Sequence, residues 1–443
     1  MSEKVYPKIL IVGQTFNKYN GGGITMTNLF TGWPREKMAL TSISNIMADL
    51  DPSICSNYYQ LSYNGKLHPF PLNLVLPKVK CGAFYVEPNA AVDSQELQPI
   101  QKAGKMKNLY KAIAKVLHFF GLFNVFYKLK LTPDFLKWVN DFKPDIIYTQ
   151  LATLETIRFV NDLHEETGIP VCVHMMDDWP KVIDQPGILY HYWKKTTDKE
   201  LRALLNKSAL LMSICDAMSE EYEQRYGGKW VAFHNTIDLS RWLPVSHTDW
   251  TASEPFRILY AGRLGVGVVE SVVDIINAVN DPSLSDCNII FELQTPNIEY
   301  LDGKVDISGR IKSVGTFDYD QIPSRISGAD MLVLPHDFDE DSVRFLRFSF
   351  STKITEYMVS GSPVLVYADG RTSLTKYAKA GDWAYVVDKR DKNQLIKAIR
   401  DLYTNKEVRE KYGKRAKEMA IRLEDSNIVR ENFRKAFEEA IKI

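Results

Sequence analysis

The chain has 443 residues, of which 45% are hydrophobic and 25% charged, and its 55 Lys and Arg residues balance 55 Asp and Glu residues. This length is sufficient for two or three globular domains. A net charge of zero argues against a nucleic-acid-binding protein, because such proteins carry a basic surface for the phosphates.

The N-terminal residues and the cysteines indicate a cytoplasmic protein. Residues 1–8 lead directly into a short apolar stretch and lack the apolar core of a secretory signal. No apolar run approaches the roughly 18 residues of a membrane-spanning helix. The five cysteines are scattered and have no metal-ligand spacing, which predicts reduced thiols and no metal site.

An early glycine-rich run provides the first candidate site. Residues 8–13 predict a parallel strand, and three glycines at 21–23 follow as a loop that enters a helix. Because glycine lets backbone N–H groups approach an anion closely, Gly22 and Gly23 are candidate phosphate-binding residues. The spacing differs from the dinucleotide-binding fingerprint, and a flexible turn is the alternative interpretation.

Residues 51–100 show no clear pattern, but residues 102–131 combine lysines with an apolar, aromatic-rich stripe and contain no acidic residue. Lys107, Lys111 and Lys115 fall on one face of a predicted helix, away from the apolar stripe. A basic amphipathic helix of this kind predicts contact with an anionic membrane surface. A core helix with a solvated lysine face is the alternative.

Polar side chains follow a predicted strand in the first half of the chain. Residues 143–148 and 169–174 each indicate a buried strand. Ligands of open α/β sheets collect at the carboxyl ends of strands, which is where His174, Asp177 and Asp178 stand. A purely structural histidine is the alternative.

The pattern of strand, glycines and helix begins again near residue 256. Residues 254–261 predict a strand, and Arg263 lies among the glycines that follow it. A guanidinium group there could hold a diphosphate through two parallel hydrogen bonds. Strands then alternate with helices, which predicts a parallel, doubly wound α/β sheet in each half of the chain.

Residues 347–366 predict a loop, a short helix, a sharp stop and a buried strand. Ser351 or Thr352 can cap the helix start, and Gly361 can end the helix. Lys353 and Glu356 fall within roughly 60° of each other on one helix face.

A lysine, a carboxylate and unpaired N–H groups at one helix start suit a nucleoside diphosphate. The N–H groups and Lys353 would bind phosphate oxygens, and Glu356 would accept hydrogen bonds from ribose hydroxyls. An ordinary surface Lys–Glu pair is the alternative.

This stretch resembles the donor-site motif of GT-B glycosyltransferases, in the retaining family of bacterial polysaccharide biosynthesis (group 1, family 4 type). A common form there is R-x-S-x-P-x-K-x-x-E-Y-x-x-x-G-x-P-V, and the chain matches it at Arg347, Ser349, Lys353, Glu356, Tyr357, Gly361, Pro363 and Val364. Ser351 replaces the proline of the motif. Phe348 stands where many relatives carry a second glutamate, and Val268 where they carry a basic residue.

The resemblance implies an α/β protein with two Rossmann-like, doubly wound parallel-sheet domains facing across a cleft. Residues 1–238 would form the N-terminal, acceptor-side domain, and 239–255 a linker. Residues 256–424 would form the C-terminal domain that binds the nucleotide-sugar donor, and 425–443 a helix that returns to the first domain.

The resemblance also implies an activity and its residues. The chain would be a retaining, metal-independent glycosyltransferase without a cofactor, at the inner face of the membrane. Its donor would be a UDP- or GDP-sugar and its acceptor a sugar or a lipid-linked sugar. The implied catalytic residues are His174, Asp177, Arg263 and Lys353, and the implied donor-binding residues are Gly22, Gly23, Arg347, Ser351, Thr352 and Glu356.

Three other interpretations stay open. Acidic triplets at 318–320, 337–339 and 339–341 have the D-x-D form that holds Mg²⁺ or Mn²⁺ in single-domain glycosyltransferases, with solvated loops as the alternative. The same fold can serve as an inactive partner subunit that binds without transferring. It can also serve a nucleotide-sugar epimerase, which needs a positioned pair of acids.

Overall fold

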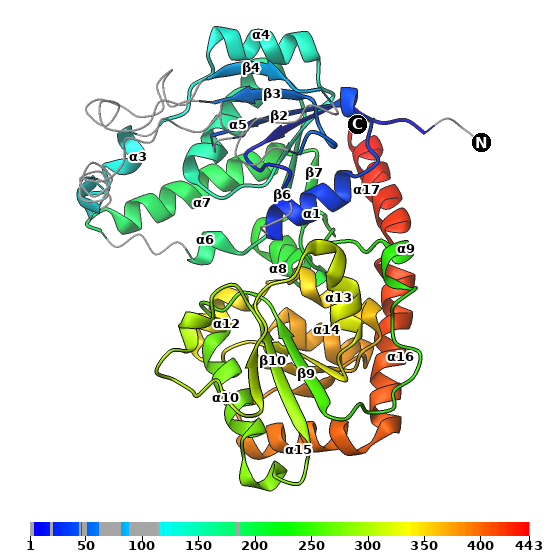
Figure 1. The fold of residues 1–443 in the computed structure, drawn as a ribbon. Coiled ribbons are helices and arrows are strands. Elements are labelled where there is room, and N and C mark those ends of the chain that lie inside the picture. Colours follow the sequence, from blue (N-terminus) through cyan, green and yellow to red (C-terminus); the bar gives the residue numbers. More distant parts are fainter. Residues whose placement is uncertain are drawn as a thin grey trace. The chain divides into compact units, whose positions relative to one another are not determined.

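The structure is a computed structural model that describes residues 4–17, 21–43, 46, 51–61, 81–87, 113, 115–117, 119–126, 128–182 and 187–442. Lys107, Lys111 and most of the lysine-rich stretch before residue 113 lie outside the described residues. The chain divides into two compact units, Met1–Phe233 with Arg430–Ile443 (unit 1) and His234–Val429 (unit 2). Each unit is an α/β sheet with helices on its faces (Figure 1).

Unit 1 is built on a sheet with the strand order β4-β3-β2-β1-β5-β6-β7-β8. The strands are β1 (Ile9–Val12), β2 (Met38–Ser42), β3 (Asn57–Gln60), β4 (Gly82–Tyr85), β5 (Ile146–Thr149), β6 (Val171–Met175), β7 (Leu210–Ser213) and β8 (Trp230–Ala232). Neighbouring strands are parallel, except that β3 and β4 are antiparallel. The apolar runs of β1, β5 and β6 are completely buried, because helices cover the sheet.

The helices of unit 1 connect these strands. They are α1 (Gly21–Phe30), α3 (Phe123–Phe126), α4 (Pro133–Phe142), α5 (Leu154–Thr167), α6 (Trp179–Val182), α7 (Tyr190–Lys207) and α8 (Asp216–Tyr226), with a 3₁₀ turn, η1 (Arg35–Lys37). Side chains cap two of them, because Thr132 and Thr153 accept N–H groups of the first turns of α4 and α5.

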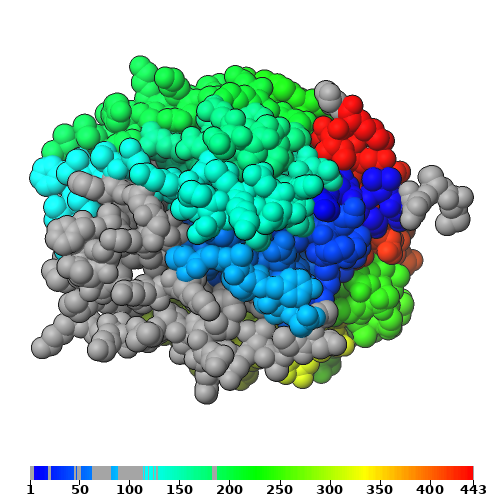
Figure 2. Space-filling model, turned by 90° about the horizontal axis from the view of Figure 1, so that it is seen from above, coloured from blue at the N-terminus to red at the C-terminus, as the bar shows by residue number. Residues whose placement is uncertain are grey.

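The C-terminal helix α17 (Ser426–Ala440) completes the core of unit 1. Its Phe433 and Phe437 pack against Phe30 of α1. Arg434 Nη1 donates to the Val5 carbonyl at 2.7 Å. The two ends of the chain therefore lie side by side, red beside blue in Figure 2.

Unit 2 has a parallel sheet with the strand order β11-β10-β9-β12-β13-β14. The strands are β9 (Phe256–Ala261), β10 (Ile289–Gln294), β11 (Ile311–Ser313), β12 (Met331–Pro335), β13 (Val364–Tyr367) and β14 (Tyr385–Val387). The helices and 3₁₀ turns are α9 (Leu239–Trp242), α10 (Val269–Val279), η4 (Pro282–Leu284), η5 (Ile298–Leu301), η6 (Tyr319–Gln321), α11 (Ile322–Ser327), α12 (Glu340–Leu346), α13 (Thr352–Ser360), α14 (Ser373–Gly381), α15 (Lys392–Thr404) and α16 (Lys406–Leu423). Two doubly wound sheets, parallel except for the β3–β4 pair, confirm the predicted α/β fold class.

The chain passes between the units at 233/234 and 429/430, whereas the sequence predicts boundaries at 238 and 424. The predicted linker, 239–255, contains α9 and packs within unit 2. Its Trp250 is buried, and the indole Nε1 donates to the Gly361 carbonyl at 2.8 Å. Gly413 leaves the room for this ring, because a Cβ there would lie 2.2 Å from Nε1.

Trp250→Ala should lower the free energy of unfolding of the chain by about 3–5 kcal/mol, because it empties a packed site in unit 2. Trp250→Phe should lower the free energy of unfolding by about 1 kcal/mol for the lost hydrogen bond, in addition to the cost of the smaller ring. Urea denaturation of the two variants measures both values. Equal stability of Trp250→Ala and wild type would show that this segment behaves as a linker.

Candidate functional site

Helix α13 begins and ends at the residues that the sequence predicts. Ser351 has extended backbone and accepts the N–H of Lys353 at 3.3 Å, so Ser351 rather than Thr352 is the N-cap. Gly361 ends the helix with a left-handed φ of 73°. The first turn therefore retains backbone N–H groups that no helix carbonyl can satisfy.

Tyr357 fixes α13 to the end of strand β9. Its side chain is completely buried, and its hydroxyl accepts the N–H of Ala261 at 3.0 Å. Ala261 is the last residue of β9, so the hydrogen bond holds the helix start at the carboxyl edge of the sheet. Parallel sheets bind their ligands at this edge.

Lys353 lies directly over the glycine that follows β9. A Cβ built on Gly262 would come within 1.7 Å of the lysine Nζ, so only glycine leaves room for the ammonium group. Nζ is 5.4 Å from the ring centroid of Tyr260. Among the described residues it has neither a hydrogen bond nor an ion-pair partner, and burial lowers the pKa of Lys353 to about 8.

Glu356 is the second desolvated charge on this helix face. Burial raises the pKa of its carboxyl to about 7, against the opposing effects of Lys353 and Arg241. Within the described part of the chain no ion pair joins Glu356 to Lys353. The pair is therefore not the surface salt bridge that the sequence allowed as an alternative, because both groups are half-buried and retain free polar atoms.

His336 is a site residue that the sequence analysis missed. The register Leu332↔Leu259 of strands β12 and β9 places His336, just after β12, level with Arg263 after β9. Nδ1 of His336 is buried without a hydrogen-bond partner. Burial, with a smaller effect of Lys353, lowers the pKa of His336 to about 4, so its ring is neutral. The same strand-end signal that selected His174 was available for His336.

The two predicted arginines occupy different surroundings. Arg263 is exposed, and its guanidinium makes no hydrogen bond with any described residue. Its loop is fixed, because Asn297 Oδ1 accepts the N–H of Leu264 at 3.0 Å. Arg347 is also exposed and lies 5.0 Å from the ring centroid of Phe348. Phe348 itself is buried in unit 2.

The second and third acidic triplets contact helix starts, whereas Asp318 of the first triplet precedes η6 without a side-chain capping hydrogen bond. Asp337 Oδ1 accepts the N–H of Ser271 in the first turn of α10 at 2.7 Å, and Asp339 Oδ1 accepts the N–H of Ser342 in α12 at 2.9 Å. Among the described residues, no group of three or more His, Cys, Asp or Glu side chains is placed to hold a metal ion. The contacts of Asp337 and Asp339 favour the structural interpretation of the triplets at 337–339 and 339–341.

The glycines of unit 1 belong to a helix rather than to a loop. Helix α1 starts at Gly21, so Gly22 and Gly23 form its first turn. A Cβ on Gly23 would come within 2.1 Å of Asn17 Nδ2, whereas Gly21 faces open space. Close packing therefore explains Gly23.

His174 has a structural environment, which corrects the expectation of a catalytic group. It is completely buried, with Nδ1 2.8 Å from the Tyr148 hydroxyl and Nε2 3.0 Å from the Phe233 carbonyl. A carbonyl only accepts, so Nε2 carries the proton and Nδ1 accepts from Tyr148. Both ring nitrogens are used within unit 1, and neither is available to a substrate.

Asp177 and Asp178 follow the same strand but differ in environment. Asp178 is buried, with Arg225 donating two hydrogen bonds, at 2.6 and 3.1 Å, and Tyr222 a third at 2.9 Å. Asp177 is exposed and makes no hydrogen bond with the described residues. Asp177 is therefore the acid of the two that remains open to a ligand.

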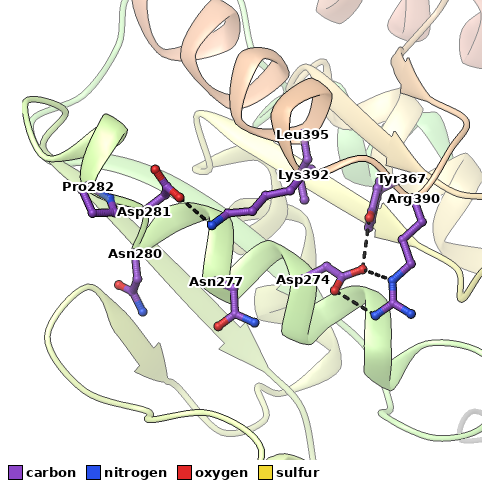
Figure 3. Close-up of a pocket in the computed structure, with 9 residues that line it drawn as sticks. All are labelled: Asp274, Asn277, Asn280, Asp281, Pro282, Tyr367, Arg390, Lys392 and Leu395. Atoms are coloured by element: carbon purple, nitrogen blue, oxygen red, sulfur yellow. Dashed lines mark hydrogen bonds and ion pairs between the residues drawn. The ribbon is translucent and has the colours of Figure 1, made fainter.

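A hollow of about 620 Å³ in unit 2 lies apart from these residues. Figure 3 shows that its charges pair with each other: Arg390 holds Asp274 at 2.8 and 3.0 Å, and Lys392 holds Asp281 at 2.7 Å. Neutralised groups give a charged ligand little to bind. The desolvated, unpaired groups around Lys353 therefore form the better candidate site.

Comparison with known proteins identifies the class. Residues 294–419 match the family model Glycosyl transferases group 1. No curated protein sequence matches the chain. The match lies within unit 2 and includes the motif at 347–364, so it confirms that this part of the chain resembles group 1 glycosyltransferases.

Solved structures share the fold of the whole chain. Sucrose-phosphate synthase from Thermosynechococcus elongatus has a TM-score of 0.59 at 12% identity, over 97% of this chain and 98% of that one. HepE from Anabaena, solved with UDP-glucose, has a TM-score of 0.59 at 14% identity, over 98% and 100%. A glycosyltransferase from Rickettsia africae has a TM-score of 0.60 at 11% identity, over 98% and 99%. These likenesses show that the chain has the GT-B fold.

Gly262→Ala should move the Lys353 ammonium and leave the fold intact, because the clashing atom is the end of a flexible side chain. The pKa of Lys353 should then rise from about 8 toward its ordinary value of 10.5. An NMR titration of the lysine side chain measures the change, with Gly265→Ala, which faces open space, as the control. An unchanged pKa in Gly262→Ala would contradict the packing described here.

Proposed function

We propose that the protein is a retaining, metal-independent glycosyltransferase that moves a hexose from a UDP- or GDP-sugar to an acceptor hydroxyl. One observation carries the proposal: Lys353 is desolvated at a capped helix start on the carboxyl edge of a parallel sheet, and no described residue forms an ion pair with it. A diphosphate supplies the missing negative charge. The group 1 family match and a relative solved with UDP-glucose support this choice.

Different residues of unit 2 bind different parts of the nucleotide-sugar donor. The N–H groups that follow Ser351 and Thr352 bind phosphate oxygens together with Lys353, while Arg263 and Arg347 supply further guanidinium contacts. Glu356 accepts hydrogen bonds from the ribose hydroxyls. His336 offers a neutral ring nitrogen beside them.

Catalysis rests on stabilising the departing nucleotide. Negative charge grows on the diphosphate as the sugar–oxygen bond breaks, and preorganised cations such as Lys353 and Arg263 lower that barrier. We assign no nucleophile. The acceptor hydroxyl attacks on the face that the leaving group vacates, and the departing phosphate takes its proton. In unit 1, Gly22 and Gly23 offer N–H groups, and Asp177 is the acid that contacts the incoming sugars.

The acceptor is a lipid-linked sugar in surface polysaccharide synthesis, and the protein works at the cytoplasmic face of the membrane. No helix in the described part of the chain is long and apolar enough to span a bilayer. Contact with anionic lipid through residues 102–131 would bring the enzyme to such an acceptor.

An inactive partner subunit and an epimerase remain the competing functions. The departures from the motif, Phe348, Ser351 and Val268, favour the inactive subunit. Hydrolysis of a nucleotide sugar by the purified protein would exclude it. The epimerase needs two positioned acids, but Asp178 is committed to Arg225. Conversion of a nucleotide sugar without an acceptor would instead support it.

Binding should be tested first with a panel of UDP- and GDP-sugars in a thermal-shift assay. The donor should raise the melting temperature of wild type and fail to do so for Lys353→Ala. Lys379→Ala removes an exposed lysine that is paired with Asp388 and should respond as wild type does. No response to any nucleotide sugar would contradict the proposal.

The two charged residues of α13 should differ in their kinetic effects. Glu356→Gln should raise the donor KM by roughly tenfold to a hundredfold, since a charge-assisted hydrogen bond contributes about 1.5–3 kcal/mol. Lys353→Ala should lower kcat more than it raises KM, because its charge matters most in the transition state. If Lys353→Ala raised KM without lowering kcat, Lys353 would have no role in the chemical step.

Donor affinity should depend on pH in a bell-shaped manner. Glu356 accepts ribose hydroxyls only when ionised, above its pKa of about 7, and Lys353 is charged only below its pKa of about 8. Affinity should therefore peak between these values. Lys353→Arg should lose the alkaline limb and Glu356→Gln the acidic limb. Calorimetric titration across pH 5–10 checks both, and a flat profile would contradict the assignment.

A further inference from the structure

Two separate segments of unit 1 expose large apolar side chains. The first lies within residues 116–125 and the second within 188–192, immediately before and at the start of α7. The members are Val116, Phe119, Phe120, Leu122, Val125, Ile188, Leu189 and Tyr192, here called the apolar patch. The exposed fraction is 67% for Ile188, 59% for Tyr192 and 54% for Phe119. Large apolar side chains are usually buried, so a cluster of exposed ones marks a candidate interaction surface.

The two segments form one surface, because three contacts join them. The N–H of Ile188 donates to the Phe119 carbonyl at 3.0 Å. The indole of Trp193 donates to the Gly121 carbonyl at 2.7 Å. A Cβ on Gly121 would come within 2.7 Å of Leu189, so the two segments are in close contact. Figure 1 accordingly shows α3 beside the N-terminal end of α7.

Packing of Trp193 fixes the second segment of the patch to unit 1. Trp193 is buried, and the Arg158 guanidinium of α5 lies 5.9 Å from its ring centroid. Arg158 is held in turn by Glu200 of α7 at 3.2 Å. The second segment of the patch is therefore continuous with a helix, α7, that packs against α5.

The two segments that form the patch carry charges of one sign. Residues 113–131 and 187–197 contain no Asp or Glu. Lys115, Lys128, Lys194 and Lys195 are exposed there. Protruding aromatic and aliphatic groups beside lysines match the interface of an anionic bilayer, where the rings enter the headgroup region and the lysines meet phosphates. A second copy of this face would instead bring lysines against lysines.

We propose that the apolar patch and its lysines dock the protein on an anionic lipid bilayer. This inference rests on the proposed function, because a lipid-linked acceptor lies at that surface, but it extends the contact to residues 188–195, which the sequence did not single out. The docking face is thus made by the fold and not by one amphipathic helix.

Vesicle flotation tests the proposal with the full chain. Wild type should float with vesicles of phosphatidylglycerol mixed with phosphatidylcholine at low salt, and less in high salt or with phosphatidylcholine alone. The double variant Phe119→Ser with Ile188→Ser should bind about 30-fold more weakly through loss of apolar area. Lys194→Gln with Lys195→Gln should bind about 25-fold more weakly at low salt only.

Matched controls separate docking from folding and from donor binding. Tyr300→Ser and Ile421→Ser remove exposed apolar groups of unit 2 and should float as wild type does. Every variant should keep the thermal shift with UDP. If wild type keeps that thermal shift but fails to float with anionic vesicles at low salt, docking is overturned and the proposed donor site is not. Flotation of the Phe119 and Ile188 variant at wild-type strength, or a change in its oligomeric state by sedimentation with no change in flotation, would also overturn the proposal.

Discussion

The candidate site depends on one buried hydrogen bond, between the Tyr357 hydroxyl and the Ala261 N–H. It joins the middle of α13 to the last residue of β9, and the lysine one turn earlier is thereby carried over Gly262. Without this bond the helix start would have no fixed relation to the carboxyl edge of the sheet. The tyrosine of the sequence motif is therefore a positioning residue, while the lysine and glutamate beside it are the groups left for a ligand.

The electrostatic character of the site follows from that placement. Lys353 and Glu356 are held on one helix face, but neither has a compensating partner among the described residues. Desolvation therefore moves both pKa values toward the neutral forms. Folding alone gains nothing from such an arrangement, since unpaired buried charges destabilise a protein. A ligand that brings both phosphates and hydroxyls would satisfy the groups together, which is why we interpret the arrangement as a binding site.

The local structure of this site was predictable, but its packing was not. Ser351, Gly361 and the apolar spacing between them define α13, because capping and periodicity are local properties of a sequence. The role of Gly262 was invisible, since the atom that excludes a side chain there belongs to Lys353, far along the chain. His174 was misjudged for the same reason: its partners Tyr148 and Phe233 come from other strands, and only the fold shows that both ring nitrogens are used.

At other positions, too, the fold distinguishes between structural and functional interpretations that the sequence left open. Asp337 and Asp339 resemble a metal motif until the helix starts they cap are seen. His336 stands at a strand end like His174, yet its buried Nδ1 has no hydrogen-bond partner among the described residues. Residues 188–192 look like ordinary apolar residues, and they become a surface only when Gly121 and Trp193 bring the preceding segment against them.

The central claim is that Lys353 binds a diphosphate. It is tested most directly by measuring the number of protons taken up or released when UDP binds. Calorimetry of UDP binding at pH 8, in two buffers with different ionisation enthalpies, measures proton exchange on binding. Because Lys353 has a pKa of about 8 in the free protein, the diphosphate should draw a proton onto it, and UDP binding should be accompanied by net proton uptake. Lys353→Arg, which is always charged, should bind UDP without that uptake. Binding with no proton uptake in wild type, or with the same uptake in Lys353→Arg, would contradict the account.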